Sequence, residues 1–407
     1  MSEVALGSAV FVAIVLIVAC VILLARAFLL PSAPVTIRIN DRMGIGARSG
    51  ERLLTALADG GIAVPAACGG GGTCGQCRVR IDKGRRPALP TEAALLSRAD
   101  LASGLRLACQ TTLRADLAVT LPETMLSARS WACRVVSSRT VAPIIREIVL
   151  APMGDAPFTF TPGAFVQVEA PAYDLAFSDY DIAPEHRAAW DQQGLDALRA
   201  QGPGGVSRAY SIANHAAADA GHIVLLIRLA LPPPGAPDAL PGVVSSWLFG
   251  RRAGDPVSVT GPFGSFAAQD STREMVLIGG GVGMAPLRAI ISDQLERQRS
   301  HRNISFWYGA RSRVDLFYDE EFSRLQAEFP NFRWTVALSD PAPDDDWHGE
   351  TGFIHEVALR GGLAAHPAPH DCDYYLCGPP MMIKAVLSML DDLGVDRERI
   401  FNDDFGA

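Results

Sequence analysis

Residues 68–77 read Cys68-Gly-Gly-Gly-Gly-Thr-Cys74-Gly-Gln-Cys77, and the rest of the chain is organised around this stretch. Three cysteines on one glycine-rich loop offer three thiolate ligands, and Cys109 offers a fourth. Glycines let such a loop wrap closely and adopt positive φ, so that backbone N–H groups face negatively charged sulfides. The stretch therefore predicts a [2Fe–2S] cluster whose ligands are Cys68, Cys74, Cys77 and Cys109.

Clustered cysteines also bind structural zinc or form disulfides. Zinc sites more often pair two short C-x-x-C hooks, whereas this loop has one hook, Cys74 to Cys77, and two single cysteines. Plant-type ferredoxins have the spacing C-x4-C-x2-C, and here five residues separate Cys68 from Cys74. The eight cysteines form no recognisable disulfide framework, which indicates a reducing compartment. We therefore favour an iron–sulfur loop of a variant kind.

The length and charge of the chain bound the remaining possibilities. A chain of 407 residues has room for two or three domains. Its net charge of -8 disfavours nucleic acid as a partner, because phosphates would repel it.

The segment from Val4 to Ala25 contains no charged residue. It is long enough to cross a hydrocarbon core of about 30 Å, which takes about 20 residues. A cleaved signal peptide would begin with positive charge, whereas the only charged side chain before this segment is that of Glu3. A buried core helix is rarely this long and apolar. We predict one permanent transmembrane helix within residues 1–30. Since Arg26 and further arginines follow it, the positive-inside rule places the remaining chain in the cytoplasm.

Residues 34–128 have the pattern of a β-grasp ferredoxin domain. Strands, helices and the cysteine loop alternate within about 90 residues. The expected strands are Val35–Asn40, Arg78–Ile81 and Leu117–Leu121, and the expected helical segments are Glu51–Leu57 and Thr91–Arg98.

Residues 131–270 predict an antiparallel β-barrel, because short apolar segments alternate there with Gly and Pro. The expected strands are Arg134–Ser138, Ile145–Leu150, Phe165–Glu169, Ala209–Ala213, Ile223–Leu229 and Pro256–Thr260. Residues 171–207 show no clear period, and we interpret them as a partly helical insertion in the barrel.

The barrel carries the sequence Arg208-Ala-Tyr210-Ser211. It resembles the R-x-Y-S strand of the ferredoxin–NADP reductase superfamily, which binds FAD. The resemblance implies that Arg208 pairs with the pyrophosphate, that Tyr210 stacks on the isoalloxazine and that Ser211 reaches its N5 atom. An arginine offers a fork of donors to a diphosphate, and a tyrosine offers a flat apolar face. The alternative is an ordinary surface strand.

A second segment supports the flavin interpretation. Residues 242–248 read Gly242-Val-Val-Ser245-Ser246-Trp-Leu. They resemble the second FAD motif of the same superfamily, in which a helix N-terminus and a serine bind the phosphates.

Residues 272–407 alternate strands and helices, which predicts an α/β domain with a parallel sheet. The expected strands are Met275–Ile278, Ile304–Tyr308, Trp334–Leu338 and Tyr374–Leu376. The first strand runs into Gly279-Gly280-Gly281-Val-Gly283-Met-Ala-Pro, a turn before a helix where a dinucleotide pyrophosphate docks. This sequence departs from G-x-G-x-x-G and resembles the nicotinamide dinucleotide loop of the reductase superfamily.

Two residues near the end of the chain complete the predicted site. Cys377 begins a Cys-Gly-Pro-Pro sequence, and the resemblance to the superfamily implies that it contacts the nicotinamide; without that motif it would be interpreted as a buried thiol. Phe405 occupies a position where the superfamily often places an aromatic ring against the flavin. We expect it to cover the isoalloxazine until nicotinamide displaces it; the alternative is that it fills a gap between the barrel and the sheet.

Taken together, these motifs and the terminal Asp403-Asp-Phe-Gly stretch resemble the F subunits of sodium-translocating NADH:quinone reductases from end to end. The resemblance implies that electrons pass from NADH to FAD, to the [2Fe–2S] cluster and to partner membrane subunits, which reduce ubiquinone and export sodium ions. It also implies a bacterial inner-membrane location with one membrane helix.

Two other functions, and the choice between NADH and NADPH, are left open by the sequence. A membrane-tethered, NADH-dependent reductase of an oxygenase would share these modules, and a tethered electron carrier or redox sensor would retain only some of them. Arg311 and Arg313 are candidates for binding the 2′-phosphate of NADPH.

Overall fold

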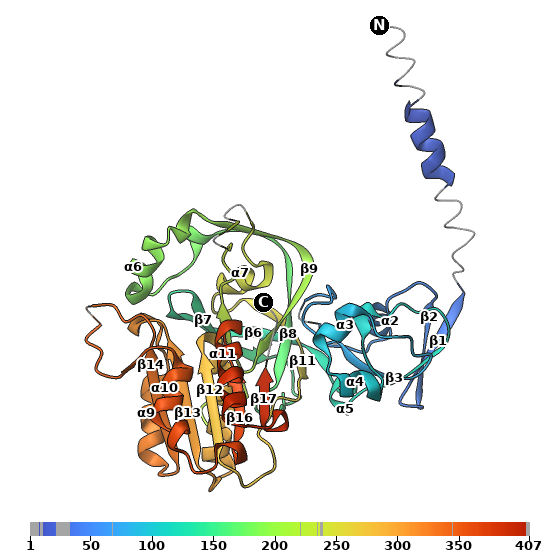
Figure 1. Cartoon of the computed structure of the whole chain (residues 1–407). Helices are drawn as coiled ribbons and strands as arrows, with labels where there is room; N and C mark the ends of the chain where they lie inside the picture. Colours follow the sequence, from blue (N-terminus) through green and yellow to red (C-terminus); the bar gives the residue numbers. More distant parts are fainter. Residues whose placement is uncertain are drawn as a thin grey trace. The chain divides into compact units, whose positions relative to one another are not determined.

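The structure is a computed structural model in which two compact units are distinguished (Figure 1). One unit comprises Met1–Val64 and Gly70–Glu123, and the other comprises Pro65–Gly69 and Thr124–Ala407. The described residues are Ser8 and the ranges 11–21, 33–66, 68–219, 221–233, 235–236, 239–343 and 345–403.

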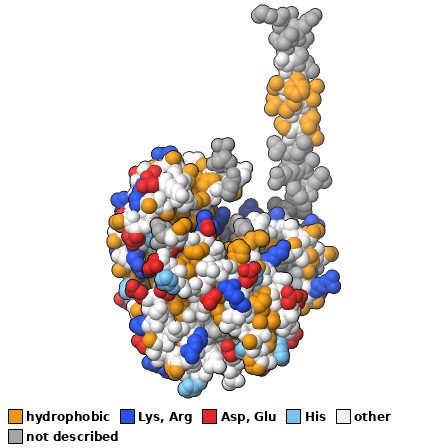
Figure 2. Space-filling view, turned by 60° about the vertical axis from the view of Figure 1, so that its left-hand side comes forward, with side chains coloured by type: hydrophobic (Ala, Val, Ile, Leu, Met, Phe, Trp, Pro, Cys, Tyr) orange, Lys and Arg blue, Asp and Glu red, His pale blue; other side chains and the backbone are white. Residues whose placement is uncertain are grey.

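The predicted membrane segment Val4–Ala25 is described only at Ser8 and residues 11–21, which are helical. Apolar side chains on this helix are exposed, for example Phe11 at 68% and Ile17 at 62% (Figure 2). No helix among the described residues is long and apolar enough to cross a membrane. The remainder of the predicted segment lies outside those residues.

The first unit contains a five-stranded mixed sheet in the order β2-β1-β5-β3-β4. Its strands are β1 (Pro34–Ile39), β2 (Met43–Arg48), β3 (Arg78–Lys83), β4 (Leu105–Leu107) and β5 (Leu117–Thr120). The helices in this part of the sequence are α2 (Leu53–Asp59), α3 (Pro90–Leu95), α4 (Arg98–Ser103) and α5 (Glu123–Leu126). Strand β1 alternates exposed and buried residues along its whole length, which is the pattern used to predict it.

One local prediction for this unit was wrong in part, and one strand was missed. The predicted helix Thr91–Arg98 is interrupted, because Leu96 is extended and Ser97 caps a new helix by accepting a hydrogen bond from the backbone N–H of Asp100. Strand β2 was not predicted, since its glycines interrupt the alternating pattern; it nevertheless pairs with all of β1.

The second unit contains an antiparallel sheet in the order β10-β7-β6-β11-β8-β9. Its strands are β6 (Arg129–Ala142), β7 (Ile145–Pro152), β8 (Phe165–Ala176), β9 (Arg199–Ser211), β10 (Ile223–Arg228) and β11 (Pro256–Phe263). Just after β9, Ile212 forms a bridge with Leu225 of β10, and the backbone N–H of Ala213 donates to Val224 O at 2.8 Å. Because these bonds join the two ends of the sheet, the sheet closes into a barrel, as predicted.

The segment predicted as an irregular insertion, residues 171–207, begins and ends as strand and contains helix α6. Strands β8 and β9 continue as a paired arm as far as Ala176 and Arg199, with a register irregularity near Pro171. Helix α6 (Pro184–Gln192) lies between the two strands in sequence, so the expectation of partial helix is confirmed. The arm escaped prediction because its two strands pair mainly with each other and do not alternate regularly between core and solvent.

The second unit also contains a parallel sheet in the order β15-β14-β13-β12-β16-β17. The strands are β12 (Met275–Gly280), β13 (Ile304–Ala310), β14 (Phe332–Leu338), β15 (Glu350–Thr351), β16 (Asp373–Cys377) and β17 (Ile400–Asp403). The helices are α7 (Val243–Phe249), which follows the barrel strand β10, and α8 (Met284–Ser292), α9 (Asp319–Glu328), α10 (Ile354–Gly361) and α11 (Pro380–Asp392). Every residue of β12 is buried, as expected for the centre of a sheet covered on both faces.

The arm is anchored by Trp190 of α6, which is fully buried and stacks on Phe249 of α7 with ring centres 5.9 Å apart. Replacing Trp190 with Ala leaves a large cavity, and we expect the free energy of unfolding to fall by about 3–5 kcal/mol. Urea unfolding followed by circular dichroism measures this. Met153→Ala, at a residue 54% exposed, is the control and should change stability by less than about 0.5 kcal/mol. Equal stability of the two variants would contradict the anchoring role.

Candidate functional site

The cysteine loop has the features needed to enclose a charged cluster. Gly70 has φ of +90°, and a Cβ there would lie 3.9 Å from the Cβ of Cys109. Cys77 and Cys109 are buried, while Cys68 and Cys74 are partly exposed. A hydrogen bond with the Cys109 thiol, together with burial, raises the pKa of Cys77 far above its usual value. Since bound metal displaces thiol protons, these crowded sulfurs fit a metal cluster better than they fit free thiols.

The predicted flavin motif lies on β9, the strand at one end of the barrel sheet. Arg208 is exposed, and its Nη1 donates to the carbonyl oxygen of Ser207 at 2.8 Å. No carboxylate forms an ion pair with Arg208 within the described parts of the chain, so its remaining donors fit a diphosphate. Burial raises the pKa of the Tyr210 phenol, which keeps this ring neutral. Ser211 is buried and ends the strand.

The second flavin segment surrounds the start of α7. A Cβ on Gly242 would lie 2.6 Å from the Cβ of Ala230, so this position requires glycine. Ser245 Oγ accepts from the backbone N–H of Ala230 at 3.2 Å and donates to Gly242 O at 3.1 Å. Ser246 is fully buried, and its carbonyl oxygen accepts from the Tyr180 hydroxyl at 2.9 Å. Ser245 thus fixes the turn before the helix, and phosphate binding by this segment stays a prediction.

The glycine loop after β12 packs against the strand that ends at Cys377. A Cβ on Gly283 would lie only 2.0 Å from Cys377 O, so no other residue fits there. Gly281 has φ of +55° with open space beside it, and the Tyr308 hydroxyl donates to its carbonyl oxygen at 3.1 Å. Gly280 is buried at the end of β12. The loop therefore presents accessible backbone at the carboxyl edge of the parallel sheet, where nucleotides bind in such sheets.

Asp403 connects the barrel motif with the parallel sheet. In the register of β16 and β17, Asp403 is the partner of Cys377. Ser211 Oγ donates to Asp403 Oδ2 at 3.1 Å, although the two residues are 192 positions apart. The structure thus connects the predicted residues Ser211 and Cys377 through one residue, the first by a side-chain hydrogen bond and the second by strand pairing. We did not predict a role for Asp403, and only its position in the terminal Asp-Asp-Phe-Gly stretch pointed to it.

A separate group of potential metal ligands comprises Glu274, His366 and Cys372, whose ligand atoms lie within 4.8 Å of one another. The backbone N–H of Ala368 donates to His366 Nδ1 at 3.1 Å, so the neutral ring carries its proton on Nε2, which faces Glu274 Oε2 at 3.3 Å. Burial raises the pKa of the Cys372 thiol to about 12. Hydrogen bonds therefore account for this group, and we assign no metal to it. Phe405, the last predicted site residue, lies outside the described residues.

Comparisons with known proteins agree with this geometry. Residues 38–114 match the 2Fe-2S iron-sulfur cluster binding domain, and residues 277–388 match the oxidoreductase NAD-binding domain. The chain is 46% identical over 407 residues to the F subunit of the Na(+)-translocating NADH-quinone reductase of Serratia proteamaculans, and 45% identical over 405 residues to that of Neisseria meningitidis. Both matches cover 100% of each chain.

The chain belongs to the family of F subunits of Na(+)-translocating NADH-quinone reductases. The resemblance inferred from the motifs is therefore confirmed.

Solved structures show that the fold of this family is shared with other reductases. The cytochrome P450 reductase GcoB of Amycolatopsis has a TM-score of 0.62 and 28% identity, covering 91% of this chain and 98% of that one. The ferredoxin reductase in carbazole 1,9a-dioxygenase has a TM-score of 0.58 and 25% identity, covering 92% of this chain and 98% of that one. The multidomain architecture is thereby confirmed.

The cluster ligands can be tested by substitution. Cys109→Ala removes one of four predicted ligands, so we expect loss of the [2Fe–2S] paramagnetic signal of the reduced protein. Cys133→Ala removes another buried cysteine, which lies in β6 of the barrel, and should keep the full signal. Iron and sulfide content provide a second measurement. A full signal in Cys109→Ala would show that the ligand set is wrong.

Asp403 can be tested through the rate of hydride transfer. Loss of hydride from NADH leaves positive charge on the nicotinamide, which a nearby carboxylate stabilises. Asp403→Asn keeps the shape but removes the charge, and we expect flavin reduction at saturating NADH to slow by about 10- to 100-fold. Stopped-flow absorbance measures this rate. Asp371→Asn, at a carboxylate that pairs with Arg273 instead, should retain the normal rate; a normal rate in Asp403→Asn would exclude the role.

Proposed function

We propose that this protein is the NADH-oxidising subunit of a membrane-bound, sodium-translocating NADH:ubiquinone reductase. It takes hydride from NADH onto FAD and passes single electrons through a [2Fe–2S] cluster to partner membrane subunits. Those subunits reduce ubiquinone and export sodium ions. Full-length relatives named as subunits of this enzyme support the assignment.

The observation that carries the proposal is the meeting of two half-sites at Asp403. The flavin motif ends at Ser211, and the nucleotide strand ends at Cys377; Asp403 is hydrogen-bonded to the first and paired in register with the second. A bound flavin supplies the conversion between two-electron and one-electron transfer. The roles of this chain are to bind and orient the rings, to hold a carboxylate beside them and to exclude water.

The assignment of each cofactor to residues is also part of the proposal. The cluster is held by Cys68, Cys74, Cys77 and Cys109. FAD is held by Arg208, Tyr210, Ser211 and the segment that starts at Gly242. NADH lies on the loop of Gly280, Gly281 and Gly283, next to Cys377. Phe405 covers the flavin when nicotinamide is absent, and Phe405→Ala should then alter the flavin spectrum while leaving FAD content near normal.

Membrane attachment is proposed for the N-terminal residues 1–30. The uncharged run from Val4 to Ala25 and the exposed apolar side chains of residues 11–21 support it. The domains that follow are residues 34–128 for the cluster, 131–270 for FAD and 272–407 for NADH. They lie on the cytoplasmic side of a bacterial inner membrane. Since the run contains no charged residue, the ion path belongs to the partner subunits.

A second candidate function is a membrane-anchored reductase component of an oxygenase. The similarity in fold to a cytochrome P450 reductase and to a dioxygenase ferredoxin reductase favours it. Identities of 28% and 25% to those two proteins, against 46% to the Serratia relative, place it second.

Purification from membranes with its partners tests the function. We expect NADH-dependent ubiquinone reduction by the complex, faster in the presence of sodium. A complex in which Cys109→Ala has removed the cluster should still reduce an artificial acceptor but no longer reduce quinone. Co-purification with an oxygenase, without sodium-stimulated quinone reduction, would support the second candidate instead.

The structure also bears on the choice between NADH and NADPH. Arg311 follows β13 and donates from Nε and Nη2 to Asp340 Oδ2 at 3.2 and 3.1 Å. Arg313 follows it and donates from Nη1 to Asp345 O at 2.8 Å. The Arg311 donors that a 2′-phosphate would need are therefore already bonded to the Asp340 carboxylate. The negative charge of that carboxylate would also repel the phosphate. This arrangement favours NADH.

Asp340→Ala should shift the preference toward NADPH. It releases Arg311, and a charged hydrogen bond to the phosphate is worth about 1.5–3 kcal/mol, or about 10- to 100-fold. The ratio of kcat/KM for NADPH to that for NADH measures the shift. Adding Arg311→Met to the variant should abolish the gain. If the ratio does not change in Asp340→Ala, the Arg311–Asp340 pair does not determine the preference between NADH and NADPH.

A further inference from the structure

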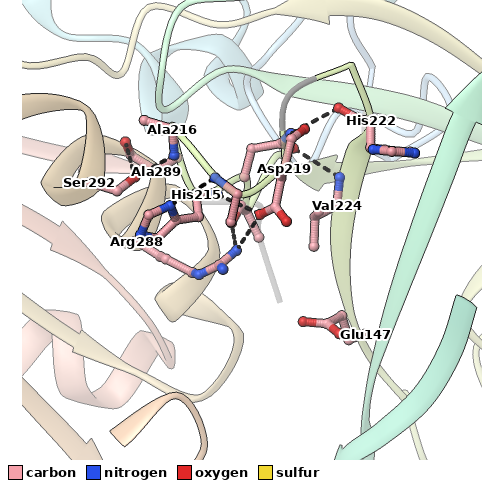
Figure 3. Close-up of polar contacts among 12 residues, drawn as sticks. Glu147, His215, Ala216, Asp219, His222, Val224, Arg288, Ala289 and Ser292 are labelled. Carbon is pink, nitrogen blue, oxygen red and sulfur yellow. Dashed lines mark hydrogen bonds and ion pairs between the residues drawn. The ribbon is translucent and has the colours of Figure 1, made fainter. Parts of the chain in front are cut away.

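Arg288 of α8 is a buried arginine that links the nucleotide helix to the flavin strand (Figure 3). Its side chain is only 6% exposed. Nη1 donates to the carbonyl oxygen of Ala213 and to Asp219 Oδ2, the latter at 3.0 Å. Nε and Nη2 each donate to a carboxylate oxygen of Glu321 at 2.8 Å. One guanidinium therefore joins two points of the loop between β9 and β10, here called the barrel loop, to helix α9.

A second connection runs through the aromatic ring beneath this guanidinium. The carbon of the Arg288 guanidinium lies 4.4 Å from the ring centre of Tyr318, at the start of α9. Burial raises the pKa of the Tyr318 phenol well above its usual value, so the hydroxyl remains a donor. It donates to Glu147 of β7 in the barrel. Arg288 thus contacts the barrel in two ways, directly through Ala213 and Asp219 and indirectly through the Tyr318 ring, which is bonded to Glu147.

The barrel loop, between β9 and β10, runs along one side of α8, the helix that follows the nucleotide loop. Arg288, Ser292 and Glu296 are spaced by four residues, so they lie close to one face of the helical segment. Ser292 Oγ accepts from the backbone N–H of Ala216 at 3.1 Å, and His215 Nδ1 lies 3.3 Å from Glu296 Oε2. The loop therefore touches the helix at three successive turns, which fixes its position along the helix axis.

The loop is stiffened by its own hydrogen bonds. The side-chain nitrogen of Asn214 donates to Asp219 O at 3.1 Å and to His222 O at 2.8 Å. Its side-chain oxygen accepts from the backbone N–H of Val224 at 2.9 Å. These bonds connect Asn214 near the start of the loop with Asp219, His222 and Val224 near its end.

We propose that Arg288 is a positioning residue for hydride transfer. Ala213, its barrel acceptor, is two residues beyond Ser211 at the flavin, and α8 begins directly after Gly283 of the nucleotide loop. Arg288 therefore sets where the nucleotide loop stands relative to the flavin strand. This inference rests on the proposed function, and it assigns a role to a residue that touches neither ring.

An arginine is required at this place because three residues, Ala213, Asp219 and Glu321, accept hydrogen bonds from one side chain. The planar guanidinium offers five N–H donors at fixed angles, whereas a lysine offers three donors from one nitrogen atom. Arg288→Lys keeps the charge but cannot reach all of these acceptors. Arg288→Met removes both charge and donors.

The test compares these variants with Arg302→Met. Arg302 is a matched control, since its side chain is 7% exposed and its Nη2 donates to Asp373 Oδ2 at 2.7 Å. Its Nη1 donates to Gln269 O at 3.0 Å, after the last barrel strand, and none of its described hydrogen bonds reaches residues 213–222 or α8. In Arg288→Met we expect flavin reduction at saturating NADH to slow by about 100-fold, the effect of roughly 1 Å of misplacement. We also expect weaker charge-transfer absorbance between nicotinamide and flavin. Arg302→Met should lower the melting temperature to a similar extent and change neither signal.

A measurement on the FAD-free protein makes the test independent of activity. Amide hydrogen exchange of residues 213–222 should accelerate in both Arg288 variants and not in Arg302→Met. If Arg288→Met fails to fold, Arg288→Lys takes its place, with an expected rate loss of about 10-fold.

Two outcomes overturn the inference. One is a normal rate and charge-transfer band in a folded Arg288 variant that has lost only thermal stability. The other is unchanged hydrogen exchange in residues 213–222. A wild-type protein whose flavin is not reduced by NADH would instead overturn the proposed function, so the two failures are distinguishable.

Discussion

The close backbone contact between the glycine loop and the end of β16 is the constraint on which the hydride site depends. A Cβ at Gly283 would overlap the carbonyl oxygen of Cys377, so the loop, the strand and the start of α8 are locked together. The ladder of β16 and β17 then places Asp403 opposite Cys377. From there a single hydrogen bond reaches Ser211 in the barrel. The positions of Asp403 and Ser211 relative to the loop thus follow from one contact, at Gly283, in which no side chain is tolerated.

Local patterns predicted most of the architecture. The cysteine spacing, the Arg-x-Tyr-Ser strand and the glycine turn each need particular residue types within a few positions, because backbone approach or donor geometry demands them. Most buried strands were also predicted, because their apolar residues recur at every second position or form continuous apolar runs. Strand β2 and the paired arm of β8 and β9 were missed where glycines or mutual pairing removed that repeat.

The contacts that complete the site could not be predicted from one sequence. Asp403 meets Ser211 across 192 positions, and Arg288 meets Ala213 across 75. An arginine inside an apolar helix carries no local sign of its partners, and a terminal aspartate looks like any exposed acid. Nothing within one turn or one strand specifies such pairs, because they arise only when two domains pack. The predicted residues are therefore the proposed cofactor ligands, and the unpredicted ones connect the two proposed half-sites.

We expect hydride transfer and electron transfer through the cluster to respond differently to destabilisation of the fold. Three of the four predicted cluster ligands, Cys74, Cys77 and Cys109, lie within the first unit, where the thiols of Cys77 and Cys109 are hydrogen-bonded. The hydride site joins residues from the barrel, the parallel sheet and the last described strand, so it exists only when the whole second unit is folded. Partial unfolding of that unit can separate Ser211 from Asp403 while Cys74, Cys77 and Cys109 remain within the first unit, since proteins open locally in cooperative units. Hydride transfer is therefore the more sensitive of the two reactions to any change in packing between the barrel and the nucleotide helices.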